Sequence, residues 1–284
     1  MEVKRRHPPW LKVRAPTGQA FFTTRRVVKT WQLHTVCEEA RCPNIGECWS
    51  HGTATFMLLG DVCTRNCGFC AVRHGKPLAV DETEPQRVAE AVAALELRHV
   101  VVTSVDRDDL PDGGASQFAR TVRAIKALRP SCTVEVLIPD FQGNWGALEQ
   151  LLDAPVDVLN HNVETVPRLY RRVRPGARYE RSLALLARAK TYRANVRTKT
   201  GLMLGLGEEE EELFEVFRDL VTVGCDILTL GQYLQPTSAH LPVVRYVPPE
   251  EFQTLRERAL SIGFRYVEAG PLVRSSYHAW KHVG

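Results

Sequence analysis

The sequence predicts an α/β fold: a partial TIM-like (β/α)6 barrel with a cysteine-bearing N-terminal extension and a C-terminal tail that closes over the barrel mouth. Three observations predict it. From residue 53 onward, apolar and β-branched runs alternate with amphipathic stretches. These runs are apolar on both faces, as the strands of a covered parallel sheet are. A cysteine-rich loop follows the first run directly, at the strand ends where such barrels place their active sites.

The elements can be assigned in chain order. Residues 1–52 show little regular pattern, so we expect an irregular extension with one short helix near residues 28–33. Residues 53–270 form the predicted barrel, and residues 271–284 form the tail. The six expected strands lie at residues 53–60, 99–105, 133–139, 156–162, 196–206 and 225–234. Helical spacing of apolar residues predicts helices around residues 88–95, 118–128 and 248–262. An acidic run at residues 208–212 predicts the start of another helix, and a strand near residues 264–269 is expected to end the barrel.

Composition narrows the class of protein. A chain of 284 residues fits one large domain or two small ones, and 44% apolar residues suffice for a sizeable core. The net charge of +4, from 37 basic and 33 acidic residues, does not indicate a nucleic-acid binder. The sequence contains no run of eighteen apolar residues, so it does not predict a membrane span. The N-terminus lacks the apolar stretch of a signal peptide. Clustered free thiols are typical of reducing compartments, so we expect a cytoplasmic protein.

Six of the eight cysteines form two triplets. The first, spaced C-x4-C-x5-C, comprises Cys37, Cys42 and Cys48, and the second, spaced C-x3-C-x2-C, comprises Cys63, Cys67 and Cys70. An iron–sulfur cube has four irons, so three thiolates leave one iron open. Disulfides would leave a thiol of each triplet unpaired, and a structural zinc site would need a fourth ligand. Two [4Fe-4S] clusters are therefore the favoured interpretation, with zinc as the alternative, and an open iron indicates chemistry at the metal.

The second triplet, placed after the first strand of a β/α barrel, resembles the signature of the radical S-adenosylmethionine (SAM) superfamily. The resemblance implies that SAM chelates the open iron through its methionine part and is cleaved to a radical by an electron from the cluster. Phe69 matches the aromatic residue that packs near adenine, with simple core packing as the alternative. Gly201-x-Met203-x-Gly205-x-x-Glu208 is similar to the fifth-strand motif of the superfamily, in which Met203 would cover the adenine.

The resemblance also suggests further SAM contacts at strand ends. Asn162 and Glu164 follow the fourth strand, where they would hydrogen-bond the ribose or simply be turn residues. The Gly-Gly-Glu usual in the superfamily is absent after the second strand, and Thr103 or Ser104 would hold the cofactor amino group there. Arg174 or Arg178 would neutralise the cofactor carboxylate, with solvation at the surface as the equal alternative for both. The acidic trio that follows Ser104 is equally interpretable as a solvated turn: Asp106, Asp108 and Asp109.

The first triplet upstream of the second, together with the segment Arg274–Ala279 (RSSYHA), resembles the lipoyl synthase family over almost the whole chain. The resemblance implies a sulfurtransferase that inserts two sulfur atoms at C6 and C8 of a protein-bound octanoyl chain. It implies that the first triplet and Ser276, with Ser275 as the rival, hold an auxiliary [4Fe-4S] cluster that is the sulfur source. An oxygen ligand should release iron more easily than a thiolate, as suits a cluster that is dismantled.

The same resemblance implies the partners. They are an octanoylated lipoyl-carrier domain or glycine-cleavage H protein, a low-potential electron donor (ferredoxin or flavodoxin), and an iron–sulfur carrier that rebuilds the auxiliary cluster. The basic arm formed by residues 4–7, Lys12 and Arg14 would steer an acidic carrier or be merely solvated. Cys132 and Cys225 lie in or beside apolar runs and need no function, and no histidine is assigned to iron. Alternatives are another sulfur-inserting or methylthio-transferring enzyme, a non-catalytic iron–sulfur carrier, and a zinc-ribbon-like nucleic-acid module.

Overall fold

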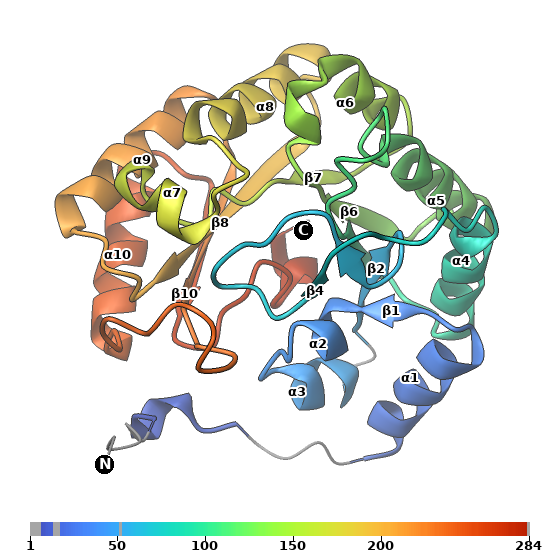
Figure 1. Cartoon of the computed structure of the whole chain (residues 1–284), viewed down its shortest axis with the longest axis horizontal. Coiled ribbons are helices and arrows are strands. Elements are labelled where there is room, and N and C mark those ends of the chain that lie inside the picture. Colours follow the sequence, from blue (N-terminus) through green and yellow to red (C-terminus); the bar gives the residue numbers. More distant parts are fainter. Residues whose placement is uncertain (1–6, 14–17, 51–52, 283–284) are drawn as a thin grey trace.

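The computed structural model describes residues 7–13, 18–50 and 53–282, and its centre is an eight-stranded sheet curved into an open barrel (Figure 1). The strand order is β1-β2-β5-β6-β7-β8-β9-β10. Neighbours from β2 to β10 are parallel, whereas β1 pairs antiparallel with β2. The strands are β1 (His34–Thr35), β2 (Thr55–Leu58), β5 (His99–Ser104), β6 (Thr133–Leu137), β7 (Val158–Asn160), β8 (Arg197–Leu204), β9 (Ile227–Gln232) and β10 (Tyr266–Gly270).

The partial barrel predicted from the sequence is confirmed. Each predicted strand is present, slightly shorter than its apolar run, and six β/α units precede β10. Burial explains why these runs form strands, because the valines of β5 at positions 100, 101 and 102 are fully buried although successive side chains point to opposite faces. A strand covered on both faces by other elements can only be apolar throughout.

Helices cover the outer side of the sheet (Figure 1). α4 buries Val88, Ala91 and Val92, the positions whose spacing predicted it, and α5 ends one residue before Arg129, ahead of Pro130. A reciprocal capping box between Glu209 and Glu212 opens α9. The outer helices are α4 (Glu84–Ala94), α5 (Ala115–Leu128), α6 (Trp145–Leu152), α8 (Tyr179–Tyr192), α9 (Glu210–Thr222) and α10 (Pro249–Ile262). The short helix α7 (Tyr170–Val173) lies inside this ring (Figure 1).

The prediction for the N-terminal extension was wrong in its detail. Instead of one short helix near residues 28–33, the extension contains α1 (Gln19–Thr30), α2 (Val36–Glu39) and α3 (Ile45–Ser50), and β1 adds to the edge of the sheet. α1 buries one narrow face, made by Phe21, Thr24 and Val28, and Phe21 packs on Trp49 of α3 with ring centroids 5.5 Å apart. The polar residues between these positions hid the helical period.

The barrel interior contains a buried polar group that the apolar character of the strands did not predict. Lys199 of β8 donates to both carboxylate oxygens of Glu135 on β6, at 2.9 and 3.1 Å, and neither side chain is exposed. Asn160 of β7 donates to the same carboxylate at 2.9 Å. The pair is tolerated because each charge is directly compensated, and removal of one partner would leave the other charge buried.

The chain returns to the barrel mouth at its C-terminal end. After β10, the segment from residue 271 turns back inside the ring of helices, where the short strand β4 (Arg73–His74) is also drawn (Figure 1). It contacts the extension directly, since Asn44 Nδ2 donates to the carbonyl oxygen of Leu272 at 2.6 Å. Within the described ranges, no helix is both long and apolar enough to cross a membrane.

Candidate active site

A cavity of about 490 Å³ opens at the carboxyl ends of the strands. Its lining includes the last residues of β5, β6 and β9, which are Ser104, Leu137 and Gln232. It also includes all six cysteines of the two triplets, although these come from the extension and from the loop after β2. Each of these cysteines is a free thiol. The two triplets, of different spacing and from different segments, thus face one common space.

The second triplet lies on the loop around β3 (Val62–Cys63) and β4. Cys63 Sγ accepts hydrogen bonds from the backbone N–H groups of Arg65, at 3.4 Å, and Asp106, at 3.3 Å. Such donors stabilise a thiolate, but burial opposes it: burial raises the pKa of Cys63 to about 11 and that of Cys67 to about 12. Burial thus favours the protonated thiols in the metal-free protein, and binding of a metal as thiolates would release these protons.

A buried arginine fixes this loop on the barrel rim. Arg65 forms a bidentate pair with Asp108, at 2.7 and 2.8 Å, and donates to Asp140 at 2.6 Å. Its side chain is 5% exposed. The solvated-turn interpretation of the acidic trio does not describe Asp106, whose pKa burial raises to about 6. Asp108 and Asp109 are exposed, and each pairs with an arginine, Asp108 with Arg65 and Asp109 with Arg107.

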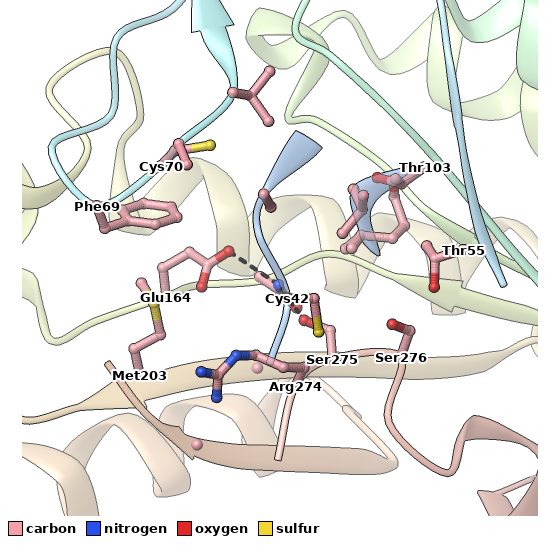
Figure 2. A pocket seen from close by; sticks show the side chains of 18 of the residues that line it. Cys42, Thr55, Phe69, Cys70, Thr103, Glu164, Met203, Arg274, Ser275 and Ser276 are labelled. Carbon is pink, nitrogen blue, oxygen red and sulfur yellow. Dashed lines mark hydrogen bonds between the residues drawn. The ribbon is translucent and has the colours of Figure 1, made fainter. Parts of the chain in front are cut away.

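The first triplet is carried by the extension. Cys37 lies in α2 and Cys48 in α3, and the backbone N–H of Cys42 donates to the carbonyl oxygen of Cys37 at 3.1 Å. Burial, and then the neighbouring Cys42, raise the pKa of Cys37 to about 11; burial also raises the pKa of Cys48. Arg274 of the tail is half-buried and lies near Cys42 and Glu164 (Figure 2). This places a guanidinium between the two ends of the cavity.

The two serines of the tail have different surroundings. Ser275 Oγ accepts a hydrogen bond from Asn162 Nδ2 at 2.6 Å, and the same amide group donates to Glu164 Oε1 at 3.0 Å. Among the residues drawn in Figure 2, Ser276 forms no hydrogen bond. Figure 2 shows Ser276 near Thr55, at the opposite end of the cavity from Phe69. Of the two serine hydroxyls, only that of Ser275 is engaged in a hydrogen bond among the residues drawn there.

The residues predicted to bind a small polar cofactor are gathered in the same cavity. They are Phe69, Thr103, Ser104, Asn162, Glu164, Arg174 and Met203. Within the part of the chain that the structure describes, three buried polar atoms there lack a hydrogen-bond partner, namely Ser104 Oγ, Asn162 Oδ1 and Arg174 Nε. Buried polar atoms are normally paired, so this set fits a polar ligand that supplies the partners. Thr103 is less suited than Ser104, because its hydroxyl already donates to the carbonyl oxygen of Leu137 at 2.8 Å.

Of the two arginine candidates, the structure places only one at the cavity. Arg174 is buried, lines the cavity and donates to the carbonyl oxygen of Asn162 at 2.6 Å. Arg178 is exposed at the N-cap of α8, outside the lining. Gly201 of the fifth-strand motif has no room for a side chain, because a Cβ there would lie 2.9 Å from Asn162 Oδ1.

Sequence reasoning missed one residue that contacts the cysteine loop. His240 Nε2 lies 2.9 Å from the carbonyl oxygen of Cys70, and Nδ1 lies 2.8 Å from the hydroxyl of Thr237. The loop is thus supported by a segment 170 residues further along the chain. Nothing in the local sequence around this histidine distinguishes it from an exposed one, so only the fold reveals it.

The donor sets of the triplets favour an iron–sulfur cluster over zinc. A closed structural zinc site needs four protein ligands, whereas each triplet offers three thiols. Three thiolates match a [4Fe-4S] cluster with one iron open to another ligand. Among the described residues, the one set of three potential ligand atoms within 4.8 Å of one another is His34, Glu39 and Asp61, and Asp61 is already paired with Arg73.

Comparisons with known proteins agree with this geometry. A family model of the radical SAM superfamily matches residues 57–220, and a model of the N-terminal domain of lipoyl synthase matches residues 1–42. The chain is 59% identical over 279 residues to the lipoyl synthase of Chloroflexus aggregans, covering 98% of this chain and 91% of the relative. It is 60% identical to the lipoyl synthase of Symbiobacterium thermophilum over 274 residues, covering 96% and 86%, and 55% identical to that of Laribacter hongkongensis over 280 residues, covering 98% and 89%.

Solved structures of low sequence identity share the fold. Methylornithine synthase superposes with a TM-score of 0.56 at 15% identity, over 75% of this chain and 69% of its own. The [FeFe]-hydrogenase maturase HydG superposes with a TM-score of 0.57 at 14% identity, over 80% and 61%. At such identities the likeness concerns the barrel alone.

Proposed function

The chain belongs to the lipoyl synthase family of the radical SAM superfamily, and from that premise we propose that it inserts two sulfur atoms, at C6 and C8, into an octanoyl chain bound to a carrier protein. One observation carries the proposal: two cysteine triplets of different spacing and Ser276 line a single cavity. A superfamily member uses SAM and one [4Fe-4S] cluster. The second triplet in the same cavity supports an auxiliary cluster beside it.

We assign the ligands accordingly. Cys63, Cys67 and Cys70 would hold the cluster that binds SAM, and Cys37, Cys42, Cys48 and Ser276 would hold the auxiliary cluster. When bound, the SAM-binding cluster would supply the electron, SAM would supply the hydrogen-abstracting radical, and the auxiliary cluster would supply sulfur. The substrate carbons carry no acidic proton, so general acid–base groups of the protein have nothing to act on.

The task of the protein residues is then to bind, orient and exclude water. Arg174 and Ser104, with unpartnered buried polar atoms, would bind the polar end of SAM, while Phe69 and Met203 would cover its adenine. Apolar residues of the same cavity, including Leu137, would hold the alkyl chain between the two clusters. Chemistry at an unactivated carbon needs such close placement, since reacting atoms must start near contact distance.

The environment of the serines supports Ser276 as the iron ligand. Ser275 is engaged by Asn162, which belongs to the SAM end of the cavity. Ser276 has no such partner among the drawn residues and lies toward the other end.

The division into an extension (1–52), a barrel (53–270) and a tail (271–284) follows from the same assignment, because extension and tail together would enclose the auxiliary cluster.

We also propose three kinds of protein partner for this chain. They are an octanoylated lipoyl-carrier domain or glycine-cleavage H protein, ferredoxin or flavodoxin as the electron donor, and an iron–sulfur carrier for rebuilding the cluster. The free thiols suit a reducing compartment such as the cytoplasm. Most of the basic N-terminal arm lies outside the described residues, so its role in docking stays a prediction.

Anaerobic reconstitution tests the proposal directly. We expect about eight iron and eight sulfide per chain, and lipoylation of an octanoylated carrier peptide detected by mass spectrometry. The related alternatives predict other outcomes: a methylthio-transferring enzyme would give a methylthio product, and an iron–sulfur carrier would release no methionine from SAM. About four iron per chain, or an unchanged peptide, would contradict the proposal.

A further inference from the structure

The tail is fastened to the extension by contacts that the proposed chemistry does not use. We propose that Glu47, Tyr277 and His278 form a clasp that seats Ser276 at the auxiliary cluster, and that these three are positioning residues for its iron. The inference rests on the proposed function, since it concerns the ligand assigned there. It goes beyond that assignment by naming what keeps a single-oxygen ligand in place.

One carboxylate of the extension holds two consecutive tail residues. Tyr277 Oη donates to Glu47 Oε1 at 3.0 Å, and His278 Nε2 lies 3.5 Å from the same oxygen. Glu47 belongs to α3 and immediately precedes Cys48, a proposed ligand. The contact therefore joins the ligand-bearing helix of the extension to the ligand-bearing turn of the tail.

The tail is held from the barrel side as well. His278 Nδ1 lies 3.8 Å from a carboxylate oxygen of Glu268 on β10 and 3.4 Å from Lys281 Nζ, and its ring stacks on Tyr277 with centroids 3.8 Å apart. The backbone of His278 has a φ of +50°, in the left-handed region that non-glycine residues seldom adopt. A residue keeps such a conformation only where its surroundings determine it, and here the two carboxylates and the stacked ring do so.

These contacts bracket the serine. The backbone N–H of Tyr277 donates to the carbonyl oxygen of Arg274 at 2.9 Å, which closes a tight turn around Ser275 and Ser276. On the upstream side, the tail backbone packs so closely on the sheet that a Cβ at Gly231 would lie 2.0 Å from the carbonyl oxygen of Val273. With both ends of the turn fixed, the backbone position of Ser276 is set, and its hydroxyl can reach only what lies within one side-chain rotation of that position.

The clasp matters because a serine ligand depends on being held close. A tethered ligand competes for its metal at an effective concentration set by how well its segment is positioned. If Tyr277 loses Glu47, the turn can swing out and Ser276 leaves the iron. The three thiolates on the extension would remain, but the fourth iron would lose its protein ligand.

The test compares Tyr277→Phe and Glu47→Ala with a matched control, Tyr192→Phe. Tyr192 is also a half-exposed tyrosine that donates to a carboxylate, Asp153 at 2.7 Å, but it lies on α8 away from the cavity. In the reconstituted protein we expect amide hydrogen exchange of the peptide spanning residues 274–279 to rise about tenfold in both clasp variants and not in the control. We also expect faster loss of one iron on mild oxidation, seen as a three-iron signal by electron paramagnetic resonance, while reductive SAM cleavage stays unchanged.

The outcomes separate the clasp from the proposed function. If the wild-type protein holds about eight iron and both clasp variants match the control in tail exchange and iron loss, the clasp is overturned and the proposed function stands. If tail exchange rises but iron loss does not, the contacts are structural only and the clasp is again overturned. If the wild-type protein holds about four iron, the proposed function fails, and the role of the clasp in iron ligation fails with it.

Discussion

At the scale of single residues, the two adjacent serines of the tail should differ sharply when replaced. Ser276→Ala removes the proposed oxygen ligand of the auxiliary cluster, so we expect lipoyl product to fall about 100-fold or more. Reductive cleavage of SAM should stay within about twofold, because the second triplet is untouched. The two rates are measured on one sample by mass spectrometry of the peptide and by release of methionine.

Ser275→Ala is the companion variant, since it differs by one position and breaks a different contact. It removes the hydrogen bond with Asn162 at the SAM end, so it should weaken SAM binding modestly and leave the auxiliary cluster loaded. The ligand assignment would be refuted by the reverse pattern, in which Ser275→Ala loses product and iron while Ser276→Ala does not.

A buried histidine should make stability depend on pH. Burial, followed by the charge of Arg174, lowers the pKa of His161 to about 4 from 6.5, while Nδ1 donates to the carbonyl oxygen of Ile138 at 2.9 Å. Because the folded-state pKa is the lower one, the unfolded chain takes up the proton first. Stability from this group is therefore complete above pH 6.5 and is lost as pH falls toward 4, by about 3 kcal/mol.

Urea unfolding of the apoprotein between pH 7 and 4 measures this effect. We expect the free energy of unfolding to fall with pH in the wild-type chain, and a shallower slope in His161→Gln, which has nothing to titrate at that position. His240→Gln is the control, because that histidine also contacts a backbone carbonyl oxygen but is not deeply buried. Equal slopes in the wild-type chain and His161→Gln would show that another group is responsible.

At the scale of elements, the loop of the second triplet should depend on Arg65. Arg65→Lys keeps the charge but cannot reproduce the bidentate pair with Asp108, so we expect a loss of about 1–2 kcal/mol in the free energy of unfolding. We also expect the cluster held by Cys63, Cys67 and Cys70 to lose iron to a chelator faster than in the wild-type protein. Arg181→Lys is the control, since Arg181 pairs with Asp140 but does not belong to the loop. Equal loss in both variants would count against a loop-specific role.

The elements also show how far sequence reasoning reaches. Strands such as β5 could be predicted because burial on both faces demands an unbroken apolar run, which few other structures share. α1 was misplaced because it buries only a narrow face, and its polar residues mask the period. The cysteines were found because their chemistry requires fixed spacing. The contacts of His240 and Asn44 could not be found, because they join residues 170 and 228 positions apart.

At the scale of the whole molecule, the barrel brings segments from both ends of the chain to one cavity. The extension contributes the first triplet, the loop after β2 contributes the second, and the tail contributes the serines. An open barrel makes this arrangement possible, because its mouth is wide and its edge strands, β1 and β10, lead directly into the extension and the tail. The two halves of the proposed chemistry are thus held by separable parts of the chain.

This separability can be tested by removing one triplet at a time. Replacing Cys37, Cys42 and Cys48 by alanine should leave about four iron per chain and preserve SAM cleavage, whereas lipoyl product should disappear. Replacing Cys63, Cys67 and Cys70 should also leave about four iron, but SAM cleavage should be lost together with the product. Iron content and methionine release distinguish the two variants in one preparation each. If removal of the first triplet abolishes SAM cleavage as well, the triplets act as one site, and the division of labour proposed here is wrong.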